Sequence, residues 1–295
     1  MSVMGYIAPI CSYSGNPHEA RFDSTKVRLV DRYNQYFEVI HAESPEQIGE
    51  CLRLRYQVYC VENPFEDPLR NPGGLETDEH DFAAMHSMLR HRESGEIVGT
   101  VRLLLPRNDK EGSGLPMRQI CRHEPMLHDN CLLPRARTAE ISRFAVSKMM
   151  RRRAGDGTVV GNFETPDHDA RRRIPDTSLG LMQAVIAMAS NSGMTHVCAV
   201  MEPMLLRMLR RFGLVMPSIG PEVDFHGRRQ PCYAHLDTGL ARVWIQRPDV
   251  WELLTSNGKY WPLNEGAVRD LQAVSIILNA GPRTEDAEAG NQFPA

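Results

Sequence analysis

The sequence predicts an α/β fold, in which helices cover the faces of a mixed β-sheet. Three observations support this prediction. Apolar runs with the character of strands alternate along the chain with runs of helical periodicity. Two strand-like runs, residues 85–91 and 97–105, are separated by a short ESG turn, as in a β-hairpin. The segment SPEQ at residues 44–47 has the pattern of a capped helix start, with proline at the first helical position.

The first half of the chain is expected to begin with an irregular arm. Residues 1–35 mix glycine, proline, serine and charged residues without periodicity, which is typical of a loosely packed segment. A short strand at 36–40 leads into the helix that starts after Ser44. An acidic loop rich in proline and glycine, residues 63–81, then connects this helix to the hairpin.

The second half continues the alternation of strands and helices. A basic connection at 148–177, interrupted by glycine and proline, is predicted to be a long loop. The other expected elements are a strand at 139–146, a packed helix from about 178, a buried strand at 195–201, a helix from Pro203, two short strands around a His-Gly turn, and a helical stretch near 238–256.

Domain boundaries follow from this order of elements. We predict an N-terminal arm over residues 1–35 and one folded domain over residues 36–237. A helical extension is expected over residues 238–280, followed by a disordered tail over residues 281–295, which is rich in polar and small residues.

Composition argues against several classes of protein. Hydrophobic residues make up 42% of the chain and charged residues 24%, as in an ordinary soluble protein. A net charge of −3 argues against nucleic-acid binding, because domains that neutralise phosphates are usually basic. No apolar run approaches the roughly 20 residues of a transmembrane helix. The N-terminal residues lack the basic and apolar regions of a secretory signal, so we expect a cytoplasmic protein.

The cysteines and histidines predict neither disulfides nor a metal site. The seven cysteines are odd in number and contain no C-x-x-C pair, which favours reduced thiols. The histidines are scattered without ligand spacing such as H-E-x-x-H. We therefore expect no bound metal and no permanently bound cofactor.

The predicted strand AEISRFAV, residues 139–146, carries two charged residues inside its apolar pattern, Glu140 and Arg143. Charged residues rarely enter a core unless they are paired or take part in chemistry. Residues three apart lie on opposite faces of a regular strand. We therefore predict a β-bulge near Ile141–Ser142 that turns both side chains toward one pocket.

Further polar residues occur in a distinctive order along the predicted domain. They are Arg55 and Tyr59 in LRLRYQVY, Asp78 and Asp81 in ETDEHD, Arg102 in VGTVRLL, and Glu140 and Arg143 in EISRF. Over roughly residues 36–236, this order resembles one branch of the GNAT acyltransferase superfamily. That branch holds the acyl-homoserine-lactone synthases and the bacterial long-chain N-acyl amino acid synthases. The chain is most similar to the acyltransferases associated with PEP-CTERM/exosortase systems.

The resemblance implies a GNAT fold and the transfer of a fatty acyl group from a thioester to an amine. The thioester donor would be carried by an acyl carrier protein or coenzyme A and bound as a co-substrate, and the acceptor would be an amine or amino acid. Glu140 and Arg143 would be catalytic, with Glu140 accepting the proton of the amine. The residues implied to bind substrate are Arg55, Tyr59, Asp78, Asp81 and Arg102.

Each of these roles has a purely structural alternative. Glu140 would instead form an ion pair with Arg143 or Arg102 that pins loop and sheet together. The aspartates and Arg102 would form a loop clamp with little net effect on stability. Arg55 would extend along the surface, and Tyr59 would belong to the core.

A basic segment after the central strand, MMRRRAGDG, contains the pattern Arg152-x-x-Gly155-x-Gly157. This pattern resembles the GNAT loop whose backbone N–H groups hold a pyrophosphate. Together with Arg151 and Arg153, these residues are predicted to dock the acyl donor, since a cationic loop suits an acidic carrier protein or a pantetheine phosphate. The alternative is a solvated turn.

Methionines are frequent in the second half and either line an apolar slot for the acyl chain or fill the core. They are Met182, Met188, Met201, Met204 and Met208.

Two other functions stay open at this point. The lactone synthases place a tryptophan shortly after the aromatic residue of the first helix, whereas the tryptophans here are Trp244, Trp251 and Trp261. This difference favours a non-lactone acyltransferase over an enzyme that uses S-adenosylmethionine. A catalytically silent module that binds an acyl carrier protein is the remaining alternative.

Overall fold

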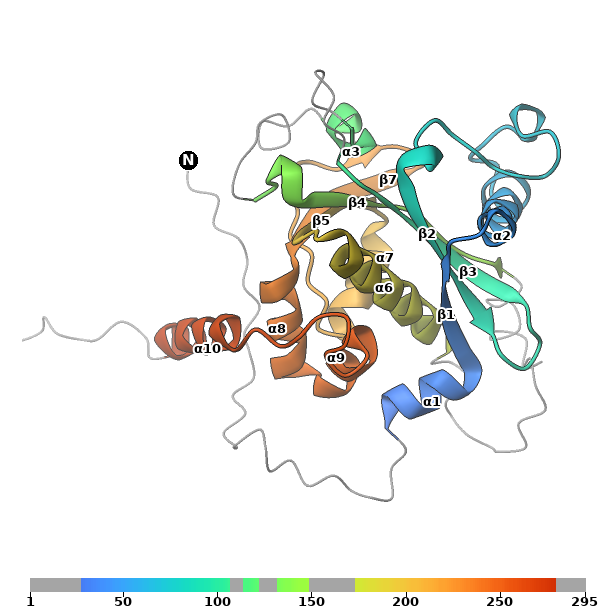
Figure 1. Cartoon of the computed structure of the whole chain (residues 1–295). Coiled ribbons are helices and arrows are strands. Elements are labelled where there is room, and N and C mark those ends of the chain that lie inside the picture. Colours follow the sequence, from blue (N-terminus) through green and yellow to red (C-terminus); the bar gives the residue numbers. More distant parts are fainter. Residues whose placement is uncertain (1–27, 107–113, 122–131, 149–172, 280–295) are drawn as a thin grey trace, which may run out of the picture.

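The computed structural model describes residues 28–106, 114–121, 132–148 and 173–279, without side chains at the two ends of the last range. Within these residues a seven-stranded sheet has the order β1-β2-β3-β4-β5-β7-β6 (Figure 1). The strands are β1 (Phe37–Ala42), β2 (Ala84–His91), β3 (Ile97–Leu104), β4 (Thr138–Val146), β5 (His196–Met201), β6 (Val223–Asp224) and β7 (Arg228–His235).

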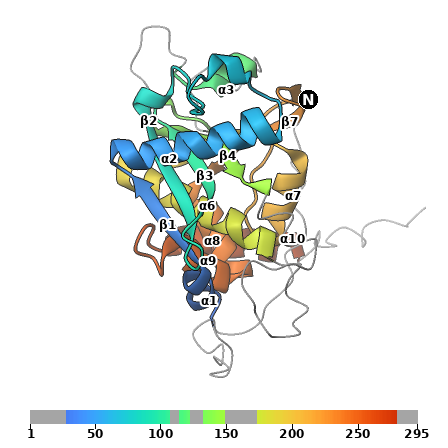
Figure 2. The same cartoon turned by 90° about the vertical axis from the view of Figure 1, so that its right-hand side faces the viewer.

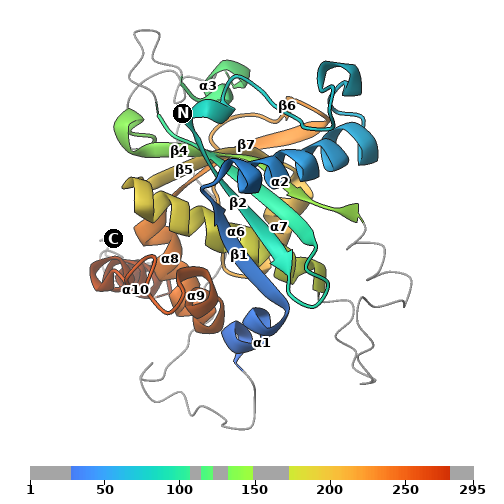
Figure 3. The same cartoon turned by 45° about the vertical axis from the view of Figure 1, so that its right-hand side comes forward.

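Helices cover both faces of the sheet, as predicted. Figures 1 and 3 show α2 on one face and α6, α8 and α9 on the other. The longer helices are α1 (Leu29–Tyr36), α2 (Pro45–Tyr56), α6 (Arg173–Ser192), α7 (Pro203–Arg211), α8 (Leu236–Gln246), α9 (Pro248–Thr255) and α10 (Glu265–Asn279). The shorter ones are α3 (Pro116–Ile120), a π-helical turn η2 (Gln57–Glu62), and the 3₁₀ turns η3 (Pro68–Arg70), η4 (Asp81–Ala83) and η5 (Arg135–Arg137). None of the helices that can be described is long and apolar enough to cross a membrane.

The predicted start of α2 is confirmed. The Ser44 side chain accepts a hydrogen bond from the backbone N–H of Gln47 at 3.3 Å, and the Gln47 side chain accepts one from the N–H of Ser44 at 3.2 Å. This capping box satisfies donors that have no partner within the helix. The predicted hairpin is confirmed as well, because β2 and β3 pair antiparallel.

The strands β4 and β5 diverge in the middle of the sheet. They pair in parallel from Thr138 opposite His196 to Ile141 opposite Ala199. Beyond Ile141, the β5-facing edge of β4 has no strand partner among the described residues, while β5 continues to pair with β7 as far as Met201. An unpaired strand edge inside a sheet leaves backbone donors and acceptors for a ligand.

The predicted bulge in β4 is present, but it lies one or two residues later than expected. Thr100 of β3 faces Ala145 and Arg102 faces Ser142, so β4 has one extra residue between these pairs. Arg143 takes up the irregularity with a φ of 49°, in the left-handed region. The bulge therefore forms at the arginine itself and not at Ile141–Ser142.

Other boundaries differ from those predicted. Residues 29–36 belong to α1 and not to an irregular arm, because Val30 and Tyr33 are buried in the main core. The helix α6 begins at Arg173, inside the predicted long loop. The helices α8 and α9 place Leu240, Leu253 and neighbouring side chains in the same core, so they are packed parts of the main fold.

A close approach between α1 and α6 predicts a destabilising substitution. A Cβ added at Gly180 would lie 1.6 Å from the Tyr33 hydroxyl and 2.9 Å from Leu89. We expect Gly180→Ala to lower the free energy of unfolding by about 1–3 kcal/mol, measured by urea denaturation. Gly49→Ala in α2 is the control, because nothing lies within 4 Å of its added Cβ and alanine favours the helix. An equal loss in both variants would contradict the packing argument.

Candidate active site

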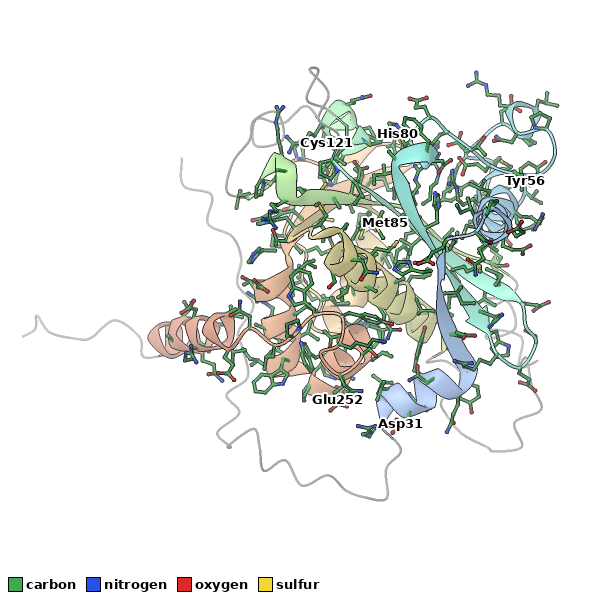
Figure 4. The ribbon with its side chains drawn as sticks, viewed as in Figure 1. Asp31, Tyr56, His80, Met85, Cys121 and Glu252 are labelled. Carbon is green, nitrogen blue, oxygen red and sulfur yellow. The ribbon has the colours of Figure 1, made fainter. Side chains whose placement is uncertain are left out.

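A cavity of about 660 Å³ lies between the diverging part of β4, α7 and the hairpin β6–β7. In Figure 2 the end of β4 points toward α7. The acidic loop and α3 bound the cavity at one end, where Figure 4 shows His80 and Cys121. The lining residues outside β4 that matter below are Tyr59, Phe65, Asp78, Arg102, Val200, Met201, Met204, Leu205, Met208, His226 and Arg229.

Glu140 lines this cavity from the paired part of β4, next to the point where β5 diverges. Its side-chain Oε2 accepts a hydrogen bond from the backbone N–H of Met117 at 2.8 Å. Burial raises the pKa of the carboxyl to about 7, because removal from water disfavours the charged form. Within the part of the chain that the structure describes, Glu140 has no cation within ion-pair distance. The alternative of a structural pair with Arg143 or Arg102 is therefore not what the geometry shows.

Arg143 lines the cavity from the bulge and is held by three carboxylates. Its Nη2 lies 2.8 Å from Glu76 Oε1, 3.2 Å from Glu66 Oε1 and 3.2 Å from Asp78 Oδ2. Although burial acts against the charge, Glu76 and its neighbours raise the pKa of the guanidinium above its ordinary value. The guanidinium also stacks over the Tyr59 ring, 5.4 Å from its centre. The bulge thus places a fixed cation beside Tyr59.

Arg55 lies behind the cavity and is fully buried, with none of its surface exposed. Its Nε donates to Glu76 Oε2 at 2.5 Å and its Nη1 to Asp81 Oδ1 at 2.6 Å. Neither Arg55 nor Asp81 is among the residues that line the cavity. The geometry instead makes Arg55 a support for the two carboxylates. This is not the solvent-exposed position that the structural alternative assumed.

Arg102 completes the network from β3. Its guanidinium lies 2.6 Å from Asp78 Oδ1, 2.6 Å from Asp81 Oδ1 and 3.1 Å from Ser142 Oγ. Burial acts to raise the pKa values of Asp78 and Asp81. The hydrogen bonds from the arginines nevertheless hold both pKa values below their ordinary range. The predicted cluster of Asp78, Asp81 and Arg102 therefore exists as an ionised, hydrogen-bonded network.

The sequence did not predict several residues of the site. Glu76 is 1% exposed and joins Arg55 to Arg143, yet it belongs to none of the spaced motifs. It stands in the same acidic stretch as Asp78, which is the one signal that pointed to it. Phe65 and His226 also line the cavity, with ring centres 5.4 Å apart, and Glu66 Oε1 lies 3.5 Å from His226 Nε2. These contacts join loops far apart in the chain.

The predicted methionines divide between the two proposed roles. Met201, Met204 and Met208 line the cavity together with Leu205 and Val200 and contribute apolar surface to it. Met182 and Met188 belong to the main core. The predicted donor loop, with Arg151, Arg152, Arg153, Gly155 and Gly157, lies outside the described residues.

Comparison with known proteins agrees with the fold. Residues 54–160 match the family profile described as acetyltransferase (GNAT) domain. None of the curated proteins compared with the chain matches it. The mixed sheet, its divergent central strands and this match identify the fold as that of a GNAT acetyltransferase domain.

Three solved structures are similar over most of their length. TofI, in a ternary complex with an inhibitor and MTA, is 22% identical, with a TM-score of 0.49, over 70% of this chain and 96% of that chain. BjaI, a CoA-dependent acyl-homoserine lactone synthase with SAM and isopentyl-CoA, is 18% identical, with a TM-score of 0.46, over 81% of this chain and 99% of that chain. FeeM, an N-acyl amino acid synthase from uncultured soil microbes, is 13% identical, with a TM-score of 0.44, over 70% of this chain and 93% of that chain.

Proposed function

We propose that this GNAT-fold chain is an N-acyltransferase that moves a fatty acyl group from a thioester to an amine, with an amino acid as the acceptor. The observation that carries the proposal is the environment of Glu140. A buried carboxylate with a pKa of about 7 faces a cavity beside an unpaired strand edge. A base whose pKa is close to the working pH is suited to remove a proton from an attacking amine.

Two parts of the cavity lining suit the two substrates. The side chains of Met201, Met204 and Met208 suit an acyl chain, since apolar surface is removed from water there. The side chains of Asp78 and Arg143 suit the ammonium and carboxylate groups of an amino acid. Asp78 keeps 21% of its side chain exposed and Arg143 keeps 14%, so both have surface left for a ligand.

The reaction then follows from these positions. The amine nitrogen attacks the thioester carbonyl carbon, and its proton passes to Glu140. The negative charge that develops on the carbonyl oxygen is stabilised by backbone N–H groups of β4 beyond Ile141, where β5 has diverged. The C–S bond breaks, and the departing thiolate takes up the proton that Glu140 received, so that the amide product and the free thiol form and the carboxylate is restored. Arg143, Asp78 and Tyr59 hold the acceptor in line with the carbonyl carbon.

The motif resemblance supports the finer assignment. The order of Arg55, Asp78, Arg102 and Glu140 resembles that of the branch that holds the acyl-homoserine-lactone synthases, the N-acyl amino acid synthases and the acyltransferases associated with PEP-CTERM/exosortase systems. The absence of a tryptophan shortly after Tyr59 favours the non-lactone acyltransferases of this branch over the lactone synthases. An acyl carrier protein or coenzyme A would carry the acyl group.

A thioester assay tests the proposed function. We expect the purified chain to release free thiol from long-chain acyl-CoA or acyl carrier protein when a mixture of free amino acids is added, with N-acyl amino acids identified by mass spectrometry. S-adenosylmethionine is the parallel arm, and a lactone product would establish lactone synthesis instead. If neither acceptor causes thiol release from either donor, the silent binding module is favoured and the proposed function is wrong.

A further inference from the structure

Glu140 has a buried cysteine as its neighbour on β5. In the parallel pairing of β4 and β5 it lies opposite Cys198, and in the antiparallel pairing of β3 and β4 it lies opposite Leu104. Residues paired in this way point to the same face of a sheet, on strands about 5 Å apart. Cys198 is 1% exposed and is not among the residues that line the cavity. It therefore borders Glu140 from the protein interior, on the β5 side.

Cys198 belongs to an apolar cluster, here called the α3 cluster, which packs α3 against β3 and β5. The buried members of the α3 cluster are Leu104, Leu115, Met117, Cys121, Leu133, Cys198 and Ile219. The backbone N–H of Met117, inside this cluster, donates the 2.8 Å hydrogen bond to Glu140 Oε2. The carboxyl group of Glu140 thus receives one backbone hydrogen bond, while the side chains next to it on both neighbouring strands are Leu104 and Cys198.

Burial and charge act in opposite directions on Glu140. Burial disfavours the carboxylate and raises its pKa, whereas the Met117 N–H and three arginines act to lower it. The ionisable side chains on the elements around Glu140 are Arg102 of β3, Arg118 of α3, Arg143 of β4, Cys198 of β5, Tyr233 of β7, Cys121 after α3, and Asp78 and His80 of the acidic loop. Burial outweighs the arginines, so the apolar neighbours decide how strong a base Glu140 is.

The thiol of Cys198 stays neutral beside this carboxyl group. Burial, and after it the charge of Glu140, raises the pKa of the thiol well above its ordinary value. A thiol is a weak hydrogen-bond donor and packs as a small apolar group. It therefore fills the space beside the carboxylate with little stabilisation of the negative charge, which a hydroxyl group or a water molecule in the same place would stabilise.

We propose that Cys198 is a positioning residue for acyl transfer, which keeps water and strong hydrogen-bond donors away from the β5 side of Glu140 and so preserves its strength as a base. This inference rests on the proposed function, in which Glu140 takes the proton of the amine. Because a neutral thiol leaves the ionised carboxylate poorly stabilised, Glu140 binds a proton more tightly than an exposed carboxylate does. Such a base is ionised near neutral pH and still accepts a proton from the amine.

Substitutions of Cys198 in the full-length chain test this role. Cys198→Ser places a strong hydrogen-bond donor beside the carboxylate. Cys198→Thr and Cys198→Val form a second pair, because the two side chains have nearly the same shape and differ by the hydroxyl group. If the serine variant does not fold, the threonine variant takes its place, with the valine variant as its reference.

Cys232→Ser is the matched control. Cys232 of β7 is also fully buried, but it pairs with Ala199, the residue after Cys198, and so faces the main core on the other side of the sheet. Its Sγ lies 3.4 Å from the carbonyl oxygen of Ala199, to which a serine hydroxyl can donate as well. The control therefore makes the same chemical change in a buried position that does not border Glu140.

The pH profile of kcat/KM is the first measurement. We expect its midpoint to fall by about 1 unit in Cys198→Ser and Cys198→Thr, because a hydrogen bond to the carboxylate favours its ionised form. The midpoint should stay within about 0.3 units of the wild type in Cys198→Val and Cys232→Ser. KM for the acceptor at pH 8 should be unchanged in all of these variants, because neither cysteine is among the residues that line the cavity.

A titration of Glu140 without substrate is the second measurement. ¹³C NMR of the glutamate carboxyl carbons follows its ionisation, and the signal that is lost in Glu140→Gln identifies it. The hydroxyl variants should show the same downward shift of the midpoint as in the kinetic profile. An unchanged midpoint in both hydroxyl variants, an equal shift in Cys198→Val, or an equal shift in Cys232→Ser would each overturn the proposal, and Cys198 would then only fill the core.

The outcome is separable from that of the proposed function. If thioester transfer depends on Glu140 while no hydroxyl variant shifts either midpoint, the role of Cys198 is wrong and the N-acyltransferase assignment stands. If the wild type transfers no acyl group from either donor, the proposed function is wrong, and the NMR titration still measures the effect of Cys198 on Glu140.

Discussion

Replacing Glu140 with glutamine is expected to lower kcat for acyl transfer by about 10²- to 10⁴-fold, the contribution usually made by a general base. Glutamine keeps the size of the side chain and can still accept the hydrogen bond from the N–H of Met117, but it cannot take a proton. Steady-state kinetics with acyl-CoA or acyl carrier protein measure the loss. Glu50→Gln, at an exposed position of α2, serves as the control and should match the wild type.

The pH dependence of the same pair of proteins gives a second readout. Because Glu140 must be ionised to act as a base, kcat/KM of the wild type should rise with pH and level off above about 7. The residual activity of Glu140→Gln should not show this rise with pH. If the glutamine variant keeps the wild-type kcat, or shows the same rise with pH, Glu140 does not act as the base.

Glu140 is also expected to lower the stability of the fold at neutral and alkaline pH. Its pKa is about 7 in the folded chain against 4.5 in the unfolded one, so the folded state binds the proton more tightly. The contribution of Glu140 to the free energy of unfolding is therefore highest below pH 4.5. It declines by about 3 kcal/mol in total as the pH rises through 7. Glu140→Gln should therefore be more stable than the wild type at pH 8 and much closer to it at pH 4.5. Urea denaturation at both values measures this difference.

Features that depend on neighbouring residues were predictable from the sequence. The capping box at Ser44 and the hairpin of β2 and β3 are specified by residues within a few positions of each other. The helix α1 was missed, because it is stabilised by packing of Val30 and Tyr33 against residues that follow much later in the chain. The helix also spans only eight residues, which is shorter than the window over which a helical period can be recognised.

The site was predictable as a set of charges but not as a network. The spacing of Asp78, Arg102 and Glu140 marked residues that do meet around one cavity, but which carboxylate binds which guanidinium depends on the fold. Glu76 illustrates this, because its two oxygens contact arginines from α2 and β4 that lie 21 and 67 residues away. The same contacts explain the shifted bulge, since Arg143 must turn toward Glu76.

Removing Arg55 is expected to give the largest loss of stability in the described structure. Arg55→Met would leave the buried Glu76 and the partly buried Asp81 with one cation fewer, which typically costs about 3–5 kcal/mol and lowers Tm by roughly 10 °C. Arg53→Met is the matched control, two residues earlier on the same helix but 61% exposed, and should change stability by less than about 0.5 kcal/mol. Thermal and urea denaturation measure both variants.

The loss of stability at acidic pH shows whether Arg55→Met destabilises the fold by removing a charge partner or by removing packed methylene groups. Burial acts to raise the pKa values of Glu76 and Asp81. Hydrogen bonds from the arginines nevertheless hold the pKa of Glu76 below its ordinary value of 4.5 and the pKa of Asp81 below its ordinary value of 3.8. The stability that these two carboxylates contribute is therefore fully present at a pH above their ordinary pKa values. It is lost as the pH falls through their lowered pKa values in the folded chain. Without Arg55 the lowering is smaller, so Arg55→Met should lose less stability than the wild type between neutral pH and pH 3. Parallel curves for the two proteins would mean that Arg55 acts through its methylene groups.

A second substitution measures how strongly the pair is coupled. Glu76→Gln removes the charge that Arg55 Nε binds at 2.5 Å, so the double variant should be more stable than the sum of the two single losses predicts. Because Glu76 also holds Arg143 at 2.8 Å, Glu76→Gln should raise KM for the amino acid more than Arg55→Met does at a temperature where both are folded. Equal KM values would mean that Arg143 keeps its position without Glu76, and that the network stabilises the loop without orienting the acceptor.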